Sequence, residues 1–322
     1  MSEVKFLKFR QKKRPLVSFV VPTYNNKNVI EKCLLMIKVQ KVSKEIIVID
    51  NGSTDKTIKI AEKYADVVFV NPIRNMAVQR NYGIQFARGR FTCFVDSDII
   101  LTSGWADGMV KTLELYKADS MIAGVGSNFH SVTKNKVTEA QDMAWQISHH
   151  SSISKVQTMT MGNCMFRTEI LKQFRINTLF SKSAEDGDLY LQMTRKGYTF
   201  LHNANLTVAH HNPTTLTALA KQYFHFGKSF WMFHIHHGII TKMLLFRFIY
   251  IPLLVVLYIF SVLETTYAIL PYFVLWFLLP EMLYSFRLLK ARHRFSFSFA
   301  VVNGWKFKWH SFGVLMGRGR GD

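Results

Sequence analysis

Two kinds of hydrophobic pattern alternate along the first 210 residues of the chain. Short apolar runs rich in β-branched and aromatic residues predict buried strands at residues 17–21, 45–49, 67–70 and 91–95. Between these runs, apolar residues recur at helical spacing over residues 28–40, 55–64 and 77–87. Strands and helices that alternate in this way predict an α/β fold, with a mostly parallel, Rossmann-like sheet covered by helices.

Polar residues gather where three of the predicted strands end. These clusters are Thr23-Tyr24-Asn25, Asp50-Asn51-Gly52-Ser53 and Asp96-Ser97-Asp98. In parallel sheets, ligands bind beyond the carboxyl ends of the strands, so we expect the clusters to line one polar pocket. No glycine-rich phosphate loop follows the first strand, which argues against a P-loop ATPase and against a dinucleotide-dependent dehydrogenase.

The acidic cluster carries the most specific chemistry. Alternate residues of an extended chain project to the same side, so Asp96 and Asp98 are expected to face a common point. Oxygen ligands of this kind suit Mg²⁺ or Mn²⁺, whose coordination is completed by substrate phosphates. Such an ion neutralises a diphosphate leaving group. On its own, an Asp-x-Asp pair is more often a turn or a helix cap.

The last hundred residues have long runs without charged side chains. Residues 248–263 and 265–280 are two such runs, separated by Glu264. With their flanks, both approach the ~20 residues that span a bilayer. Basic residues lie outside the pair, at positions 242, 247, 287, 290, 292 and 294, which predicts a transmembrane hairpin with its outer ends in the cytoplasm. A re-entrant hairpin and a buried hairpin of a soluble domain are the alternatives.

Charge and composition favour a membrane-associated protein. The chain has 41 Lys and Arg against 21 Asp and Glu, a formal net charge of +20, which favours an anionic partner. Aromatic residues crowd the C-terminal third, where basic and aromatic residues together suit a lipid surface better than nucleic acid. We therefore expect membrane lipids as partners and no nucleic acid, since a nucleic-acid binder is supported by charge alone. The three cysteines contain no CxxC pair and predict neither a disulfide framework nor a zinc site.

Together these patterns predict five regions along the chain. They are a basic N-terminal segment (1–15), an α/β domain (16–215), an amphipathic interfacial helix (216–241), the transmembrane hairpin (242–290), and a basic, aromatic interfacial segment (291–322). The basic N-terminal segment reads either as a disordered tail or as a membrane-surface segment. The sequence does not define an oligomeric state.

Six segments in order resemble the inverting glycosyltransferases of family 2, which have the GT-A fold. They are VPTYNN (21–26), IVIDNGSTDKT (47–57), AVQRNYGI (77–84), FVDSD (94–98), GNCMFR (162–167) and AEDGDL (184–189). The resemblance covers roughly residues 16–212. It departs from the family pattern at Ala184, in a loop that is often rich in glycine, and this leaves the geometry of the acceptor site open.

The resemblance implies a role for each matching residue. The nucleotide-sugar site would be formed by Pro22, Tyr24, Asn25, Asp50, Ser53, Arg80 and Asp96. The metal ligands would be Asp96, Asp98 and His210. Asp186 matches the catalytic base, with Glu185 beside it on the acceptor side. From the residues alone, Glu185 and Asp186 are also suitable acids for the start of a helix over 187–196.

We expect an enzyme that moves a sugar from a UDP-, GDP- or dTDP-sugar to a lipid-linked acceptor, with inversion. A membrane segment favours a lipid acceptor, such as a polyprenyl-phosphate or polyprenyl-diphosphate saccharide. A synthase of polyprenyl-phosphate monosaccharides is the alternative, although its phosphate nucleophile hardly needs a base such as Asp186. An inactive scaffold with the same fold is a further alternative. The absence of a QxxRW motif argues against a processive polysaccharide synthase.

Overall fold

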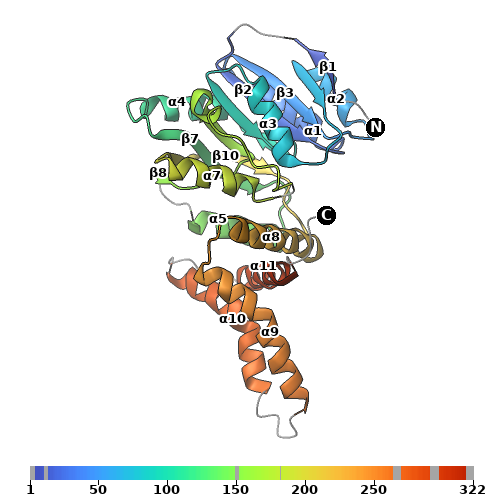
Figure 1. The fold of residues 1–322 in the computed structure, drawn as a ribbon, viewed down its shortest axis with the longest axis vertical. Helices are drawn as coiled ribbons and strands as arrows, with labels where there is room; N and C mark the ends of the chain where they lie inside the picture. Colours follow the sequence, from blue (N-terminus) through green and yellow to red (C-terminus); the bar gives the residue numbers. More distant parts are fainter. Residues whose placement is uncertain are drawn as a thin grey trace. The chain divides into compact units, whose positions relative to one another are not determined.

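The computed structural model describes residues 4–10, 14–148, 152–181, 183–263, 270–290 and 297–316. The chain forms two compact units (Figure 1). The first comprises Met1–Val132 and His149–His211, and the second comprises Thr133–Ser148 and Asn212–Asp322. The segment 133–148 therefore belongs with the C-terminal helices, whereas the sequence pattern placed it inside the α/β domain.

A ten-stranded sheet forms the centre of the first unit. Its path is β1-β4-β3-β2-β5-β9-β7-β10-β6, and β8 pairs with β10. The strands β2, β3, β4, β5, β7 and β10 run in one direction, which agrees with the predicted mostly parallel α/β fold. Their bounds are β1 (Lys5–Phe9), β2 (Val17–Thr23), β3 (Lys44–Asp50), β4 (Val67–Val70), β5 (Phe91–Val95), β6 (Ile99–Leu101), β7 (Ile122–Ser131), β8 (Ile153–Val156), β9 (Asn163–Arg167) and β10 (Thr199–His210).

Part of the basic N-terminal segment adds a strand to this sheet. β1 pairs antiparallel with β4 at the sheet edge, so residues 5–9 are not the disordered tail that we considered. Met1 to Glu3 and residues 11–13 of the same segment lie outside the described residues.

Helices cover both faces of the sheet. They are α1 (Ile30–Lys38), α2 (Thr57–Tyr64), α3 (Met76–Phe86), α4 (Trp105–Leu115), α6 (Thr168–Leu171) and α7 (Glu185–Arg195). Because side chains alternate along a strand, Phe19 and Val21 of β2 pack in the core with α1, α2 and α4. Val20 between them packs in the second core with α3 and α7. The strand pattern thus places one helical layer on each face.

Helix starts differ in detail from the sequence expectation. The helix expected over residues 55–64 begins at Thr57 as α2, and its N-cap residue, Lys56, makes no side-chain cap. Instead, the Asp55 carboxylate accepts a hydrogen bond from the Thr57 amide at 2.9 Å. Asn75 caps α3 by accepting a hydrogen bond from the Val78 amide at 3.1 Å.

The second unit is helical. It contains α5 (Lys136–Ser148), α8 (Leu216–His236), α9 (Lys242–Leu263), α10 (Leu270–Lys290) and α11 (Phe297–Met316). Figure 1 shows α8 and α11 side by side, and a side chain at Gly227 or Gly313 would collide with the backbone of the facing helix. α11 also packs on α5, where the Asn303 side chain donates a hydrogen bond to the Ala140 carbonyl at 3.5 Å.

The C-terminal segment differs from our expectation of a surface-lying segment. α11 buries Phe299, Val302, Phe307 and Val314 within the second unit. These residues form part of the core between the helices, since a small helical unit must bury the apolar side of at least one central helix. Residues 317–322 of the expected interfacial segment lie outside the described residues.

Within the described residues, one helix is long and apolar enough to cross a membrane. It covers Lys242–Phe260 of α9, and Arg247, expected ahead of the span, lies inside this helix. The second expected span is present as a shorter apolar stretch, Val274–Leu283 of α10. The described helices therefore do not support the predicted multi-pass arrangement. Glu264, Arg292 and Arg294, used to predict the turn and the orientation, lie outside the described residues.

Candidate active site

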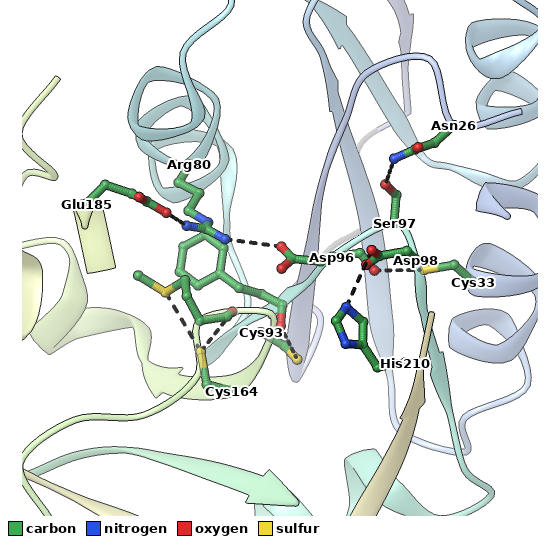
Figure 2. A network of polar contacts seen from close by, with 12 residues as sticks. Asn26, Cys33, Arg80, Cys93, Asp96, Ser97, Asp98, Cys164, Glu185 and His210 are labelled. Atoms are coloured by element: carbon green, nitrogen blue, oxygen red, sulfur yellow. Dashed lines mark hydrogen bonds and ion pairs between the residues drawn. The ribbon is translucent and has the colours of Figure 1, made fainter. Parts of the chain in front are cut away.

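The carboxyl ends of β2 and β3 are held together by side chains of the first unit. Gln79 of α3 donates hydrogen bonds to the carbonyl groups of Thr23 (2.9 Å) and Ile49 (2.8 Å). Beyond β2, the Asn26 amide group donates to the Ser97 hydroxyl at 2.5 Å, as Figure 2 shows. These bonds bring the ends of the strands to one edge of the sheet, as the polar clusters predicted.

Asp50 and Ser53 form a closed turn after β3. One Asp50 oxygen accepts from the Ser53 amide and the other from the Ser53 hydroxyl, both at 2.6 Å. Burial raises the pKa of the Asp50 carboxyl, although the bonds from Ser53 oppose this effect. The Ser53 hydroxyl also accepts a hydrogen bond from the Asn25 backbone amide at 2.8 Å. Three of the predicted nucleotide-binding residues therefore form one hydrogen-bonded group.

A buried guanidinium joins two of the predicted acidic residues. Arg80 makes an ion pair with Asp96 at 3.1 Å and a second, very close ion pair with Glu185 (Figure 2). The side chains of Arg80 and Glu185 are 4% and 7% exposed. Burial on its own would lower the pKa of Arg80, but Glu185 and Asp96 outweigh it, so the guanidinium stays charged. Burial also raises the pKa of Glu185, against the opposing effect of Arg80.

Asp96 is positioned by a neighbouring glycine as well as by Arg80. The Asp96 amide donates to the Gly162 carbonyl at 3.1 Å. A side chain at Gly162 would overlap the Asp96 carboxylate. The space that this glycine leaves open therefore allows Asp96 to reach Arg80. The GNCMFR segment of the sequence contributes this space, a role that its residue pattern alone did not indicate.

Asp98 and His210 face each other beside Asp96. Their side-chain atoms Oδ2 and Nε2 are 3.4 Å apart, and the side chains are 38% and 23% exposed (Figure 2). Adjacent ligands of an octahedral Mg²⁺ lie about 3 Å apart, because each bond is about 2.1 Å long. The Asp98–His210 pair therefore fits two neighbouring positions around a divalent ion, and its oxygen and nitrogen donors suit Mn²⁺ or Mg²⁺.

Asp96, the third predicted metal ligand, is paired with an arginine. Oδ1 of Asp96 is bound by Arg80. Among the residues that the structure describes, no group of three or more His, Cys, Asp or Glu is assembled as a metal centre. If Asp98 and His210 held an ion, its other positions would have to be filled by substrate or water.

Asp186 lies at the start of α7, next to Glu185. It is half-buried, and its Oδ1 accepts a hydrogen bond from the Gly187 amide at 2.7 Å. The preceding residue, Ala184, occupies the left-handed region with φ +72°. The loop that is often rich in glycine in the family thus keeps a glycine-like backbone here, although the residue is alanine.

A pocket of about 380 Å³ lies at this edge of the sheet. Pro22, Tyr24, Asp96 and Asp98 from the predicted site are among the residues that line it. Arg74 also lines it, and its guanidinium lies over the Tyr24 ring at 4.3 Å from the centroid. The sequence interpretation missed Arg74, because it lies in a loop between two predicted elements and outside the six matching segments.

The sequence is similar to known glycosyltransferases. Residues 18–175 match the family model "Glycosyl transferase family 2". The chain is 27% identical over 229 residues to glycosyltransferase AglE of Haloferax volcanii, a match that covers 66% of this chain and 72% of AglE. It is 23% identical over 231 residues to a dolichyl N-acetyl-α-D-glucosaminyl phosphate 3-β-D-2,3-diacetamido-2,3-dideoxy-β-D-glucuronosyltransferase of Methanococcus voltae, which covers 66% of this chain and 71% of that protein.

A solved structure shares the fold. It is the mannosyltransferase PcManGT from Pyrobaculum calidifontis in complex with GDP-Man and Mn²⁺, with a TM-score of 0.53 and 19% identity. The similarity covers 72% of this chain and 68% of that one, so the first unit has a GT-A-like fold. From these relatives, and from the match of residues 18–175 to the family 2 model, we conclude that the protein is a glycosyltransferase.

Proposed function

We propose that the protein transfers a sugar from a nucleoside-diphosphate sugar to a lipid-linked acceptor, with inversion at the anomeric carbon. The observation that carries this proposal is a series of ion-paired side chains at one edge of the sheet. It runs from the Asp98–His210 pair through Asp96 and Arg80 to Glu185. Such a series offers a place for a metal-bound diphosphate at one end and for an acceptor at the other.

On the donor side, Asp98 and His210 would hold a divalent ion, Mg²⁺ or Mn²⁺, with Asp96 next to them. When bound, this ion would neutralise the charge that develops on the diphosphate as its bond to the sugar breaks. Pro22 and Tyr24 line the same pocket and are suited to hold the nucleoside, and the Asp50–Ser53–Asn25 group shapes the adjoining turn.

On the acceptor side, Asp186 is the better candidate for the base. Glu185 is buried and paired with Arg80, so its carboxylate is engaged in positioning that guanidinium. Asp186 is half-buried, and one of its oxygens accepts a hydrogen bond from the backbone amide of Gly187 at the start of its own helix. In direct displacement, the acceptor hydroxyl oxygen forms the new bond to the anomeric carbon and its proton passes to the Asp186 carboxylate. The nucleoside diphosphate leaves from the opposite face.

The acceptor class is inferred from the second unit. α9 carries an exposed apolar surface and is long enough to cross a membrane, which supports an anchored enzyme whose acceptor stays in the bilayer. The name of the relative from Methanococcus voltae describes transfer to a dolichyl phosphate that already carries a sugar. A sugar hydroxyl on such a lipid needs a base, which agrees with Asp186. Lys242, the first residue of α9, favours a catalytic unit in the cytoplasm.

Two substitutions separate the two ends of the site. Asp186→Asn should lower transfer to lipid extract by about 10²- to 10⁴-fold, because the proton acceptor is lost, while donor affinity changes by less than about threefold. Asp98→Asn should weaken Mn²⁺-dependent donor binding itself. The measurements are thermal shift with UDP-, GDP- and dTDP-sugars with and without Mn²⁺, followed by transfer of radiolabelled sugar in membranes.

Asp107→Asn provides the matched control, because the Asp107 side chain is 48% exposed and makes an ion pair with Lys111 on the same helix. It should bind donor and transfer sugar like the unchanged protein. Full transfer by Asp98→Asn would overturn the metal assignment, and full transfer by Asp186→Asn would overturn the base assignment. Loss of donor binding in both variants would show that the two ends are not separate.

A further inference from the structure

Arg74 has a position that neither the sequence motifs nor the family match explains. It lies in the loop between β4 and α3, is exposed, and lines the pocket that also contains Asp96 and Asp98. Resting on the nucleotide-sugar function proposed above, we propose that Arg74, held over the Tyr24 ring, binds the diphosphate of the donor.

The charges around the pocket favour this role. Asp96 and Asp98 are acidic, and Arg74 is the basic residue among the described residues that line the pocket. The other guanidinium close by, that of Arg80, is buried and engaged with Asp96 and Glu185. A donor diphosphate entering beside two carboxylates needs positive charge besides a metal ion. Arg74 supplies it at the pocket wall.

The stacking geometry leaves the guanidinium ready to bind. Its central carbon lies over the Tyr24 ring, 4.3 Å from the ring centre, which is within the range of a cation–π contact. Within the described residues, the N–H groups of Arg74 have no hydrogen-bond partner, so they are available to a ligand. A planar fork of N–H donors matches two phosphate oxygens, and the ring limits the orientations that the side chain samples before binding.

This proposal changes the role expected for Arg80. The family resemblance implied that Arg80 contacts the base or the diphosphate. In the structure, Arg80 is 3% exposed and its guanidinium lies between two carboxylates. We therefore assign the contact with donor oxygens to Arg74 and the positioning of Asp96 to Arg80.

Calorimetric titration of the full chain in detergent tests the proposal. The probes are UDP, UMP and uridine, and the corresponding guanine and thymine series, each with Mn²⁺. Arg74→Gln should weaken binding of the preferred nucleoside diphosphate by about 10- to 100-fold, as expected for the loss of charged hydrogen bonds. Binding of the nucleoside should change by less than about twofold. Arg74→Lys should bind the diphosphate with an affinity between those of the unchanged protein and Arg74→Gln, because lysine keeps the charge but lacks the planar set of N–H donors.

Arg175→Gln is the matched control, since Arg175 is an exposed arginine of the same unit that lines a different hollow. It should bind all probes like the unchanged protein. Equal losses for the diphosphate and the nucleoside in Arg74→Gln would mean a contact with the base and overturn the proposal, as would an unchanged diphosphate affinity. If the unchanged protein bound none of the three diphosphates, the donor class of the proposed function would itself be wrong.

Discussion

Arg80 has two acidic neighbours at a place where water is nearly excluded. Desolvation makes an isolated buried charge very costly, and ion pairs offset that cost only while both partners are present. Arg80 and Glu185 are therefore interdependent, although 105 positions separate them in the chain. Their pairing also joins α3 to the start of α7, the two elements that carry the arginine positioning Asp96 and the candidate base.

Removing one charge of the Arg80–Glu185 pair should lower the free energy of unfolding more than removing both charges does. Arg80→Gln should lower the free energy of unfolding by about 3–5 kcal/mol, because Glu185 stays buried without its partner. Adding Glu185→Gln should recover part of that loss. Denaturant unfolding of the three variants measures the coupling, with Lys155→Gln as an exposed-pair control expected to cost less than about 1 kcal/mol. Strictly additive losses would argue against the interdependence.

Ala184 holds a backbone conformation that suits glycine. Left-handed φ costs a residue with a Cβ about 1–2 kcal/mol, while glycine loses about 0.5–1 kcal/mol of chain entropy instead. Ala184→Gly should therefore raise stability by somewhat less than about 1 kcal/mol, seen as a higher Tm. Gly104 provides the reverse test, since it has φ +74° and open space around the missing Cβ. Gly104→Ala should lower Tm through backbone strain alone, and a neutral result there would remove the basis for both expectations.

At the scale of whole elements, α5 belongs to a different unit from the one that its position in the sequence suggests. It follows β7 of the sheet, yet it packs in the second unit with Leu219 of α8 and with Phe299 and Val302 of α11. Its own contribution to that cluster is Ala140, with Val137 and Met143 packed against it. A chain truncated after β10 would thus lack α8 and α11, the helices that bury the apolar face of α5.

Two truncated chains test this packing. A chain ending at residue 211 should aggregate in the absence of detergent, because the apolar face of α5 is exposed to water. A chain ending at the same residue, with 133–148 replaced by a Gly/Ser linker, should be soluble and monodisperse in size-exclusion chromatography. Equal solubility of the two chains would show that α5 does not need the C-terminal helices.

For the molecule as a whole, the features that could be predicted from the sequence are those that short stretches of residues determine. The β-branched runs marked the strands that form the centre of the sheet, and the polar residues after them marked the edge where the pocket lies. The metal-side pair Asp98 and His210 was named from the acidic segment and from the family resemblance, and the two residues do face each other. The enzyme class followed from the order of six short segments.

What escaped prediction depends on contacts between distant residues. The Arg80–Glu185 pair, the stacking of Arg74 on Tyr24 and the membership of α5 in the second unit have no local pattern in the sequence. The segment 291–322 was expected to be interfacial because of its basic and aromatic content, but α11 within it buries Phe299, Val302, Phe307 and Val314. The hydrophobic run 265–280 was expected to approach the length of a span; its first five residues lie outside the described residues, and the apolar stretch found in the described part is Val274–Leu283 of α10.

The placement of α5 also has a consequence for how the protein is made. Its contact with α11, at Ala140 and Asn303, joins residues that are 163 positions apart. At 5–20 residues per second, the ribosome needs about 8 to 30 s to synthesise the intervening chain. During that interval the α/β unit can already fold, but the apolar face of α5 has no partner. A newborn chain is therefore exposed to aggregation for longer than one in which each unit is encoded as a single uninterrupted stretch.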